Sequence, residues 1–449
     1  MEVQFLPMNK KITVEPFNEY GIIIDIGTTT ATACLFDLIK KSEIIRISKN
    51  NPQKVYGADV ISRISYGNQS EMHLKTLNQL ILDCCNQLID ELLMESRIFD
   101  ENNIKADKDM KTAGRDIFYH QIKKLVILGN TTMREIFLGR SIKGLAKVPF
   151  IGVDYDICIF SGKEKKFHIS PEGEVIVLPG IHGHVGSDTL GCILAVNLDR
   201  QKGTSLLIDI GTNGEIVISR DGKMICTSTA AGPAFEGASI YQGMKASKGA
   251  IRGVHIDHYN VTLDVIGEIS PTGICGSGVI DAIAELVRAG IVDRTGRILP
   301  ADEVKNPLAA RITSDNGMRF ILADSEKGCN IVLTQQDIRE VQLAKAAIYA
   351  GIISLLKAAG IGMKDIDNLY VAGAFGSNIN INNAIALGLL PEIDIERIKF
   401  IGNGAINGGI KLLSGEYTIA ETLLCKKIKH IELANDSEFQ KRYINAINF

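Results

Sequence analysis

The fold is decided by the stretch Ile24-Asp25-Ile26-Gly27-Thr28, whose five residues return in the same order at 208–212. Each copy follows an apolar, largely β-branched run and leads into a second apolar run, which predicts a strand, a tight turn and a second strand. In such a turn the glycine lets the backbone approach a ligand, and the hydroxyl and N–H groups beyond it can bind phosphate oxygens. Two copies that lie 184 positions apart therefore predict a duplicated α/β domain whose turns clamp a nucleoside triphosphate.

An aspartate ends the first strand of each copy, Asp25 in one and Asp209 in the other. A carboxylate at this place can hold a hydrated Mg²⁺, or it can simply cap the turn. We expect the residues that follow to contact phosphates, although β-propensity alone is the plainer explanation of the threonines. These residues are Gly27, Thr28, Thr29, Thr30, Gly211, Thr212, Asn213 and Gly214.

The composition is that of an ordinary globular protein. Of the 449 residues, 45% are hydrophobic and 22% are charged, so the chain is long enough for two or more domains with full cores. A net charge of −3 argues against nucleic acid or an anionic membrane as a partner, since either needs a basic face. The nine cysteines include no Cys-x-x-Cys pair, and neither a signal peptide nor a membrane span is visible. We expect a cytoplasmic protein with reduced thiols.

We expect residues 1–20 to be a leader or the remnant of a linker, residues 21–202 to form a first domain, and residues 203–449 to form a second. A charged surface connection is expected at 99–115. Hydrophobic periodicity and glycine-rich turns predict the other main elements. They are a long amphipathic helix at about 71–97, a strand at 125–128 followed by a helix at 133–138, helices at 279–289 and 335–356, and a strand at 369–372.

These motifs resemble those of the actin-like ATPases, a superfamily that includes sugar kinases, acetate kinase and the chaperone ATPases. The resemblance implies a duplicated actin-like (ribonuclease H-like) fold, in which two related α/β domains hold the nucleotide in the cleft between them. Residues 25–30 are similar to the first phosphate motif of that superfamily, residues 209–214 to the second, and residues 371–376 to the adenosine motif. Residues 129–132 and 276–278 are similar to the two connecting segments at which the domains hinge.

Further nucleotide contacts follow from this resemblance. The turn Gly373-Ala374-Phe375-Gly376 is expected to lie against the adenine. Gln342 and Lys345 lie three residues apart on one face of a helix, as in the ribose-contacting helix of the chaperone ATPases. An exposed lysine on a helix is more often only solvated, so both interpretations of Lys345 stay open.

Four other positions are weaker candidates. Glu236 lies in a compact loop after the second copy, where its carboxylate can orient the attacking water, bind a partner or cap a local turn. Asn130 is a candidate for a position near the γ-phosphate. His182 and His184 lie in a glycine-rich loop and suit a metal or corrinoid contact, although surface or turn positions are the commoner role of such histidines. Cys275 is expected to be buried rather than redox-active.

A narrower set of motifs resembles the reductive activators of corrinoid proteins. The motifs are Thr28-Thr29-Thr30, Asn51-Pro52-Gln53, Tyr56–Arg63, Gly129–Thr132, Gly232–Gly237 and Thr334–Arg339. Proteins of that kind use ATP to help return an inactive Co(II) corrinoid to the methyl-accepting Co(I) state. The resemblance therefore implies an ATPase that takes ATP and Mg²⁺, acts on a corrinoid protein of a methyltransferase system and forms a homodimer.

The sequence departs from that pattern in one respect. Activators of this kind usually carry an iron–sulfur domain ahead of the ATPase portion, and this sequence has no cysteine cluster. We therefore expect no iron–sulfur cluster in this chain. Either a separate electron donor supplies the electrons, or this member has another function.

Two other functions fit the same superfamily. A small-molecule kinase would need a catalytic base that faces an acceptor pocket, and the sequence identifies none. A non-catalytic nucleotide-binding scaffold would use ATP only to stabilise a complex with a partner. P-loop ATPases and dinucleotide enzymes are disfavoured, because neither Gly-x-x-x-x-Gly-Lys-Ser/Thr nor a Gly-x-Gly-x-x-Gly after a strand occurs. The sequence leaves open whether ATP is hydrolysed or only bound.

Overall fold

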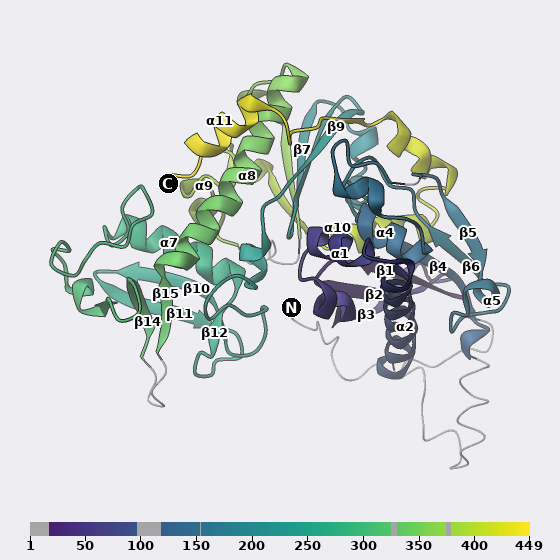
Figure 1. The fold of residues 1–449 in the computed structure, drawn as a ribbon, viewed down its shortest axis with the longest axis horizontal. Coiled ribbons are helices and arrows are strands. Elements are labelled where there is room, and N and C mark those ends of the chain that lie inside the picture. Colours follow the sequence, from purple (N-terminus) through teal and green to yellow (C-terminus); the bar gives the residue numbers. More distant parts are fainter. Residues whose placement is uncertain (1–17, 97–117, 153, 325–329, 374–378) are drawn as a thin grey trace, which may run out of the picture. The chain divides into compact units, whose positions relative to one another are not determined.

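The computed structural model describes residues 18–96, 118–152, 154–324, 330–373 and 379–449, which form two compact units (Figure 1). The N-terminal unit contains the described residues up to Arg200 together with Asn403–His430. The C-terminal unit contains Gln201–Gly402 together with Ile431–Phe449. Most of the predicted leader and the whole of the predicted connection at 99–115 lie outside the described residues.

The N-terminal unit is built around a six-stranded sheet with the order β3-β2-β1-β4-β6-β5. Its strands are β1 Tyr20–Ile26, β2 Thr30–Asp37, β3 Ser42–Asn50, β4 Ile122–Gly129, β5 Cys158–Ser161 and β6 Glu174–Val177. The short strand β18 Lys429–His430 lies in the last segment of this unit but is not a strand of this sheet. Its helices are η1 Pro52–Tyr56, α1 Val60–Gly67, α2 Glu71–Glu95, α4 Thr131–Leu138, η2 Lys143–Ala146, α5 Gly162–Lys165, α6 Ser187–Ala195, η3 Leu198–Arg200, α10 Gly404–Leu413 and η9 Ala420–Lys427. The isoleucines at 22–24 in β1 are fully buried, so the central strand is covered on both faces.

The C-terminal unit contains five neighbouring strands of a six-stranded sheet, in the order β17-β16-β7-β8-β9, and two three-stranded sheets, β11-β10-β12 and β13-β14-β15. The strands of the first sheet are β7 Thr204–Ile210, β8 Gly214–Arg220, β9 Lys223–Thr229, β16 Asn368–Ala372 and β17 Ile398–Gly402. The other strands are β10 Ala250–Asp257, β11 Asn260–Val265, β12 Gly273–Ile274, β13 Ile312–Thr313, β14 Arg319–Ala323 and β15 Ile331–Thr334. The helices are η4 Pro233–Glu236, α7 Gly276–Arg288, η5 Pro307–Arg311, α8 Gln335–Ala359, η6 Met363–Asp365, α9 Ile381–Ala386, η8 Ile395–Arg397 and α11 Ser437–Asn445.

Both units share one five-stranded core. The order β3-β2-β1-β4-β6 in the N-terminal unit corresponds to β9-β8-β7-β16-β17 in the C-terminal unit. In both cores the first two pairings are antiparallel and the last two are parallel. The repeated sequence motif ends the central strand in each case, β1 or β7. The duplication that the sequence predicts is therefore present in the topology of the sheets.

Two glycines show the same equivalence at the level of single residues. Gly129 ends β4 with a φ of 155°, and Gly373 directly follows β16 with a φ of 112°. A Cβ atom on Gly129 would lie 2.7 Å from the carbonyl oxygen of Ile26, and one on Gly373 would lie 2.4 Å from that of Ile210. Ile26 and Ile210 are the third residues of the two motif copies, so each motif closes against an equivalent glycine that no larger residue can replace without strain.

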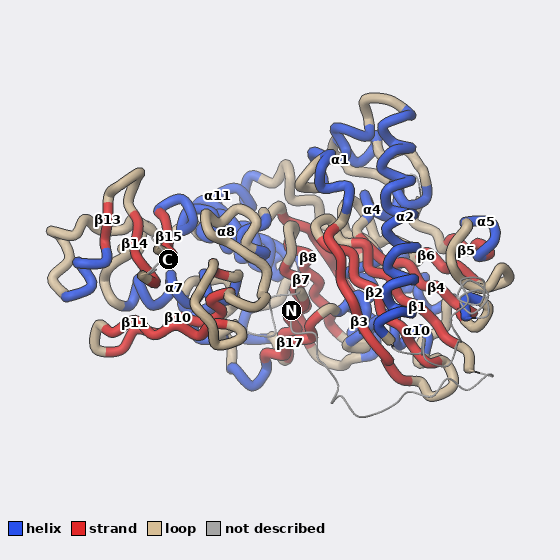
Figure 2. The backbone as a smooth tube through the Cα atoms, turned by 90° about the horizontal axis from the view of Figure 1, so that it is seen from below, coloured by secondary structure: helices blue, strands red, loops and turns tan. Residues whose placement is uncertain are grey.

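The long helix of the N-terminal unit confirms the predicted amphipathic pattern. α2 lies along the sheet over β2 and β3 (Figure 2). Ser70 caps its first turn by accepting a hydrogen bond from the N–H of His73. Its buried side chains recur at helical spacing and fill the core of this unit; they are Leu77, Ile81, Cys84, Cys85, Leu88, Ile89, Leu92 and Leu93.

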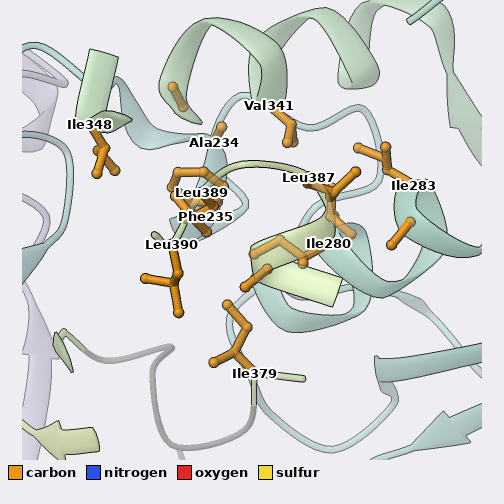
Figure 3. Close-up of a cluster of buried hydrophobic side chains, with 14 of the residues drawn as sticks. Ala234, Phe235, Ile280, Ile283, Val341, Ile348, Ile379, Leu387, Leu389 and Leu390 are labelled. Atoms are coloured by element: carbon orange, nitrogen blue, oxygen red, sulfur yellow. The ribbon is translucent and has the colours of Figure 1, made fainter. Parts of the chain in front are cut away.

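Phe235 anchors a loop of the C-terminal unit in the hydrophobic core (Figure 3). Its buried ring belongs to one cluster with Leu389, Leu390, Ile280 of α7 and Val341 of α8, all of which are labelled in Figure 3. Because Phe235 belongs to η4, this packing also fixes the position of the last residue of η4, which is Glu236.

Residues 403–430 pack with the N-terminal unit although they follow β17 in the chain. α10 packs against α6, β1 and β4. A Cβ atom on Gly408 would lie 2.1 Å from the carbonyl oxygen of Gly191 in α6, so the two helices touch backbone to backbone. α6 and α10 follow the equivalent strands β6 and β17. The expected division near residue 202 does not anticipate this return, and the division itself stays a prediction.

The helices predicted at 71–97, 279–289 and 335–356 correspond to α2, α7 and α8, with ends that differ by a few residues. Within the described ranges, α8 alone is long and apolar enough to span a membrane. However, 72% of its most apolar window is buried inside the fold, which is typical of the core helix of a globular domain.

Candidate functional site

The two copies of the motif form turn 1 (residues 25–30) and turn 2 (residues 209–214). At the start of turn 1, the half-buried carboxylate of Asp25 accepts a hydrogen bond at Oδ2 from Nδ2 of Asn403, at 3.0 Å. Asn403 is the N-cap of α10, and its Oδ1 accepts a hydrogen bond from the N–H of Ile406 at 2.8 Å. The first turn of α10 therefore fixes the orientation of the Asp25 carboxylate.

Residues 51 and 63 donate hydrogen bonds to three successive carbonyl groups of turn 1. Asn51 donates its side-chain amide to the oxygen of Gly27 at 2.9 Å and its backbone N–H to the oxygen of Thr29 at 3.0 Å. Arg63 donates to the oxygen of Thr28. In a trans peptide the C=O and the following N–H point in opposite directions. The N–H groups of Thr28 and Thr29 therefore point away from residues 51 and 63, and neither has an acceptor within the described part of the chain.

Asn130 lies beside turn 1. Its Nδ2 donates to the hydroxyl of Thr28 at 2.9 Å, and its Oδ1 accepts from the N–H of Met133 at 3.0 Å. Asn130 is the N-cap of α4, so one side chain orders both the start of this helix and the hydroxyl of turn 1. The structure brings Asn130 and Thr28 together, and a contact with a γ-phosphate stays a prediction.

Turn 2 is supported differently from turn 1. The strand register leaves four residues between the paired positions of turn 1 and three in turn 2. The carbonyl oxygen of Thr212 accepts from the backbone N–H of Gly232 at 2.8 Å. Thr212 is the counterpart of Thr28, so a backbone N–H does in turn 2 what the Arg63 side chain does in turn 1.

Glu236 lies against turn 2. The hydroxyl of Thr212 donates to its Oε1 at 3.0 Å, and a Cβ atom on Gly211 would lie 3.7 Å from the same oxygen. Its Oε2 is buried and has no hydrogen-bond partner among the described residues. An ionised carboxylate only accepts hydrogen bonds, so this oxygen is available to a water molecule or to a ligand donor.

Neither the backbone angle φ nor the contacts of the described residues require a glycine at position 211. Its φ lies outside the left-handed region, and a Cβ atom would meet only ordinary contacts, such as one of 3.6 Å to the oxygen of Asn213. A glycine that the chain does not need is typical of a place where a ligand approaches the backbone closely.

Three of the residues predicted to bind the base or the ribose lie outside the described residues, namely Ala374, Phe375 and Gly376. Gly373 is described and closes against Ile210. Gln342 is fully buried; its Oε1 accepts from Arg339 at 2.7 Å, and its Nε2 donates to the oxygen of Thr295 at 3.0 Å. Its amide is thus bonded on both sides within the C-terminal unit.

Lys345 is also buried rather than solvated. Its ammonium group donates to the oxygen of Asn448 at 2.6 Å and lies 5.3 Å from the ring centroid of Phe449. Burial lowers the pKa of Lys345 to about 8. Both Gln342 and Lys345 contact protein groups, and their contacts with a ribose stay a prediction.

The turns offer oxygen donors to a cation. Asp25 and Asp209 are half-buried at the ends of equivalent strands. Across the described ranges, no group of three or more His, Cys, Asp or Glu side chains is placed to hold a metal ion. Mg²⁺ needs only one or two carboxylates, because it keeps several of its waters. The carboxylate of either turn, taken by itself, suits a hydrated Mg²⁺, whereas transition metals take His or Cys ligands, and binding of Mg²⁺ stays a prediction.

The remaining candidates have structural partners. The ring of His182 stacks against the rings of Tyr155 and His430, with distances between ring centroids of 5.9 Å and 4.8 Å. The ring centroid of His184 lies 4.9 Å from that of Phe150. Cys275 is buried, as predicted, with its Sγ 3.4 Å from the oxygen of Ile251.

Sequence reasoning misses Asn403, and it finds Asn51, Arg63 and Gly232 only as members of resemblance motifs. A signal for Asn403 exists, since it follows a strand and a glycine in the same way as Asn130 does. No comparable local signal exists for Arg63, because its contact with Thr28 spans 35 residues of the chain.

Two protein-family models match the chain and together cover almost all of it. A model described as the RACo middle region matches residues 20–201. A model described as the C-terminal domain of RACo, the ASKHA domain, matches residues 203–449. ASKHA denotes the actin-like superfamily, so the predicted fold class is confirmed.

Individual proteins agree with these models. The chain is 37% identical over 453 residues to the corrinoid activation enzyme RamQ of Eubacterium limosum, covering 98% of this chain and 72% of the relative. It is 26% identical over 465 residues to the [Co(II) methylated amine-specific corrinoid protein] reductase of Methanosarcina barkeri, covering 96% and 77%. Among solved structures, a reductive activator for a corrinoid, iron–sulfur protein superposes with a TM-score of 0.85 at 33% identity, covering 97% of this chain and 67% of that one.

Proposed function

This chain belongs to the RACo family of reductive activators, and on that basis we propose that it is an ATP-dependent activator of a corrinoid protein. The proposed activity is to bind and hydrolyse Mg-ATP and so promote the reduction of Co(II) to Co(I) in a corrinoid methyltransferase system. The relatives support this proposal, because their names describe activation or reduction of corrinoid proteins.

One observation carries the nucleotide part of the proposal, namely the paired turns on equivalent strands. Each turn begins with a half-buried aspartate and presents N–H and hydroxyl groups, which suit phosphate oxygens. Asp25 and Asp209 would hold Mg²⁺ through water, and the bound ion would neutralise charge on the phosphates. The cleft that the superfamily resemblance implies stays a prediction.

Hydrolysis rather than mere binding is supported by Glu236. In the proposed step, water attacks the γ-phosphorus and the bond from that phosphorus to the oxygen of the leaving ADP breaks. The buried Oε2 of Glu236 would accept a hydrogen bond from the attacking water and take up its proton. Thr212 holds the other carboxylate oxygen and so fixes the direction of the carboxylate.

The reduction itself needs one electron for each cobalt. We place the electron donor outside the described residues, as a separate low-potential reductant. ATP and the corrinoid protein would have to favour the same conformation of the activator, since a ligand shifts an equilibrium only by its differential affinity. Homodimer formation and a cytoplasmic location stay predictions from the sequence.

The test is ATP turnover by the purified protein, alone and with a Co(II) corrinoid protein. We expect turnover that rises with the corrinoid protein. Glu236→Gln removes the proton acceptor and should lower turnover by about 10²-fold or more while ATP still binds. Glu392→Gln, an exposed carboxylate of the same unit, serves as the matched control and should leave turnover unchanged.

Other outcomes point to other functions. Turnover that rises with a sugar or a small acid, and not with a corrinoid protein, would favour a kinase. Binding of ATP with no turnover under any condition would favour a scaffold and remove the hydrolytic role of Glu236.

A further inference from the structure

Arg63 is a fully buried arginine whose acceptors are all neutral. Its guanidinium donates to the carbonyl oxygens of Thr28 and Gly57, to Oε1 of Gln53 at 3.3 Å, and to the sulfur of Met133 at 3.1 Å. Within the part of the chain that the structure describes, no carboxylate forms an ion pair with it. A buried cation without a counter-charge is costly, so its presence calls for a reason.

The other fully buried arginine of the described residues is paired with carboxylates, as buried cations usually are. Arg134 contacts the carboxylate of Glu135 at 2.6 Å and lies 3.5 Å from that of Asp154. For Arg63, burial lowers the pKa to about 10, and the more distant Asp59 only partly offsets this effect. Among the described residues, therefore, no side chain forms an ion pair with Arg63, and Asp59 balances its charge only in part.

Turn 1 provides the place for such a group. Arg63 holds the carbonyl of Thr28, and the N–H of Thr29 in the same peptide plane points the opposite way without an acceptor. Asn51 orients the N–H of Thr28 in the same manner through the oxygen of Gly27. Two N–H groups that face one side of a tight turn make a binding place for an anion.

We propose that Arg63 is the positioning residue for the polyphosphate of ATP: it presents the N–H of Thr29 to a phosphate oxygen, and that phosphate balances its buried charge. The inference rests on the proposed function, because it takes ATP as the ligand of turn 1. Arg63 acts through turn 1 and touches no phosphate itself. In turn 2 the equivalent carbonyl group, that of Thr212, accepts from the backbone N–H of Gly232 instead of from a charged side chain.

The test compares the affinities of ATP and AMP, which lacks the β- and γ-phosphates, by titration calorimetry. Arg63→Met should lower the ratio of ATP to AMP affinity by about tenfold or more, because both the charge and the oriented N–H are lost. Arg63→Lys keeps the charge but cannot reproduce the set of hydrogen bonds, so its ratio should lie between those of Arg63→Met and the wild type. A role in folding alone would lower both affinities together and leave the ratio unchanged.

Arg140→Met is the matched control, because Arg140 belongs to the same unit and its guanidinium is paired with Asp154 at 2.6 Å. Its affinity ratio should stay within about twofold of the wild type. If Arg63→Met does not fold, Arg63→Lys carries the test by itself. The wild-type ratio in a folded Arg63 variant would overturn the proposal for Arg63 alone, whereas a wild-type protein that binds no ATP would remove the proposed function as well.

Discussion

Lys345 illustrates how burial changes the chemistry of a single side chain. Its ammonium group lies inside the C-terminal unit, bonded to the oxygen of Asn448, and its pKa is lowered from 10.5 to about 8. Between these two values the unfolded chain binds a proton that the folded protein has released, so stability rises with pH in that window. Below pH 8 both states are protonated, and the full cost of burying the charge is present.

We therefore predict a specific pH dependence for Lys345→Met. The free energy of unfolding of the wild type, minus that of the variant, should rise by up to about 3 kcal/mol between pH 8 and pH 10.5. Denaturant unfolding at a series of pH values measures this difference. Lys357→Met, which alters an exposed lysine on the same helix, should give a flat difference. A flat or falling curve for Lys345→Met would show that the ammonium group is not buried as described.

The sequence identifies the residues of the two turns but not those that hold them. The motif copies are contiguous, so Asp25, Thr28 and their counterparts can be found by inspection. Arg63 and Asn403 reach turn 1 only through folding, and Lys345 appears in the sequence as an ordinary helical lysine. Contacts between residues that are distant in the chain leave no local pattern from which to predict them.

At the scale of elements, the start of α8 explains one of the resemblance motifs. Thr334 and Asp337 form a capping box, and Asp337 also accepts from the N–H of Tyr241 at 2.7 Å. Gln335 accepts from the N–H of Ile298 and donates to the oxygen of Gly296. The motif at 334–339 thus ties two loops to the first turn of the longest helix in the C-terminal unit.

Removal of this cap should lower the free energy of unfolding. Asp337→Ala would leave the buried N–H group of Thr334 and the partly buried N–H group of Tyr241 without acceptors, so we expect a loss of about 2–4 kcal/mol in the free energy of unfolding. Gln336→Ala, at the exposed neighbouring position, should change it by less than about 0.5 kcal/mol. Urea unfolding of the three proteins gives both values. Equal stability of the two variants would mean that the box does not hold the start of α8.

At the scale of the whole molecule, the duplication was predictable and the return of residues 403–430 was not. Repeated motifs in equivalent strand contexts reveal two α/β cores, and the order of strands in both sheets agrees. The backbone contact between α6 and α10 depends on Gly191 and Gly408, which stand more than two hundred residues apart in the sequence. Glycine spacing in a single sequence does not say which helix lies opposite.

The central claim is that this protein uses ATP to promote the reduction of a Co(II) corrinoid. The most direct measurement is anaerobic: the visible spectrum of a Co(II) corrinoid protein with a low-potential reductant and Mg-ATP, recorded with and without this protein. The account predicts that Co(I), or methyl-cobalt once a methyl donor is added, appears only when both the protein and ATP are present. The account would be contradicted if this protein binds ATP but the spectrum of every corrinoid partner tried remains the Co(II) spectrum.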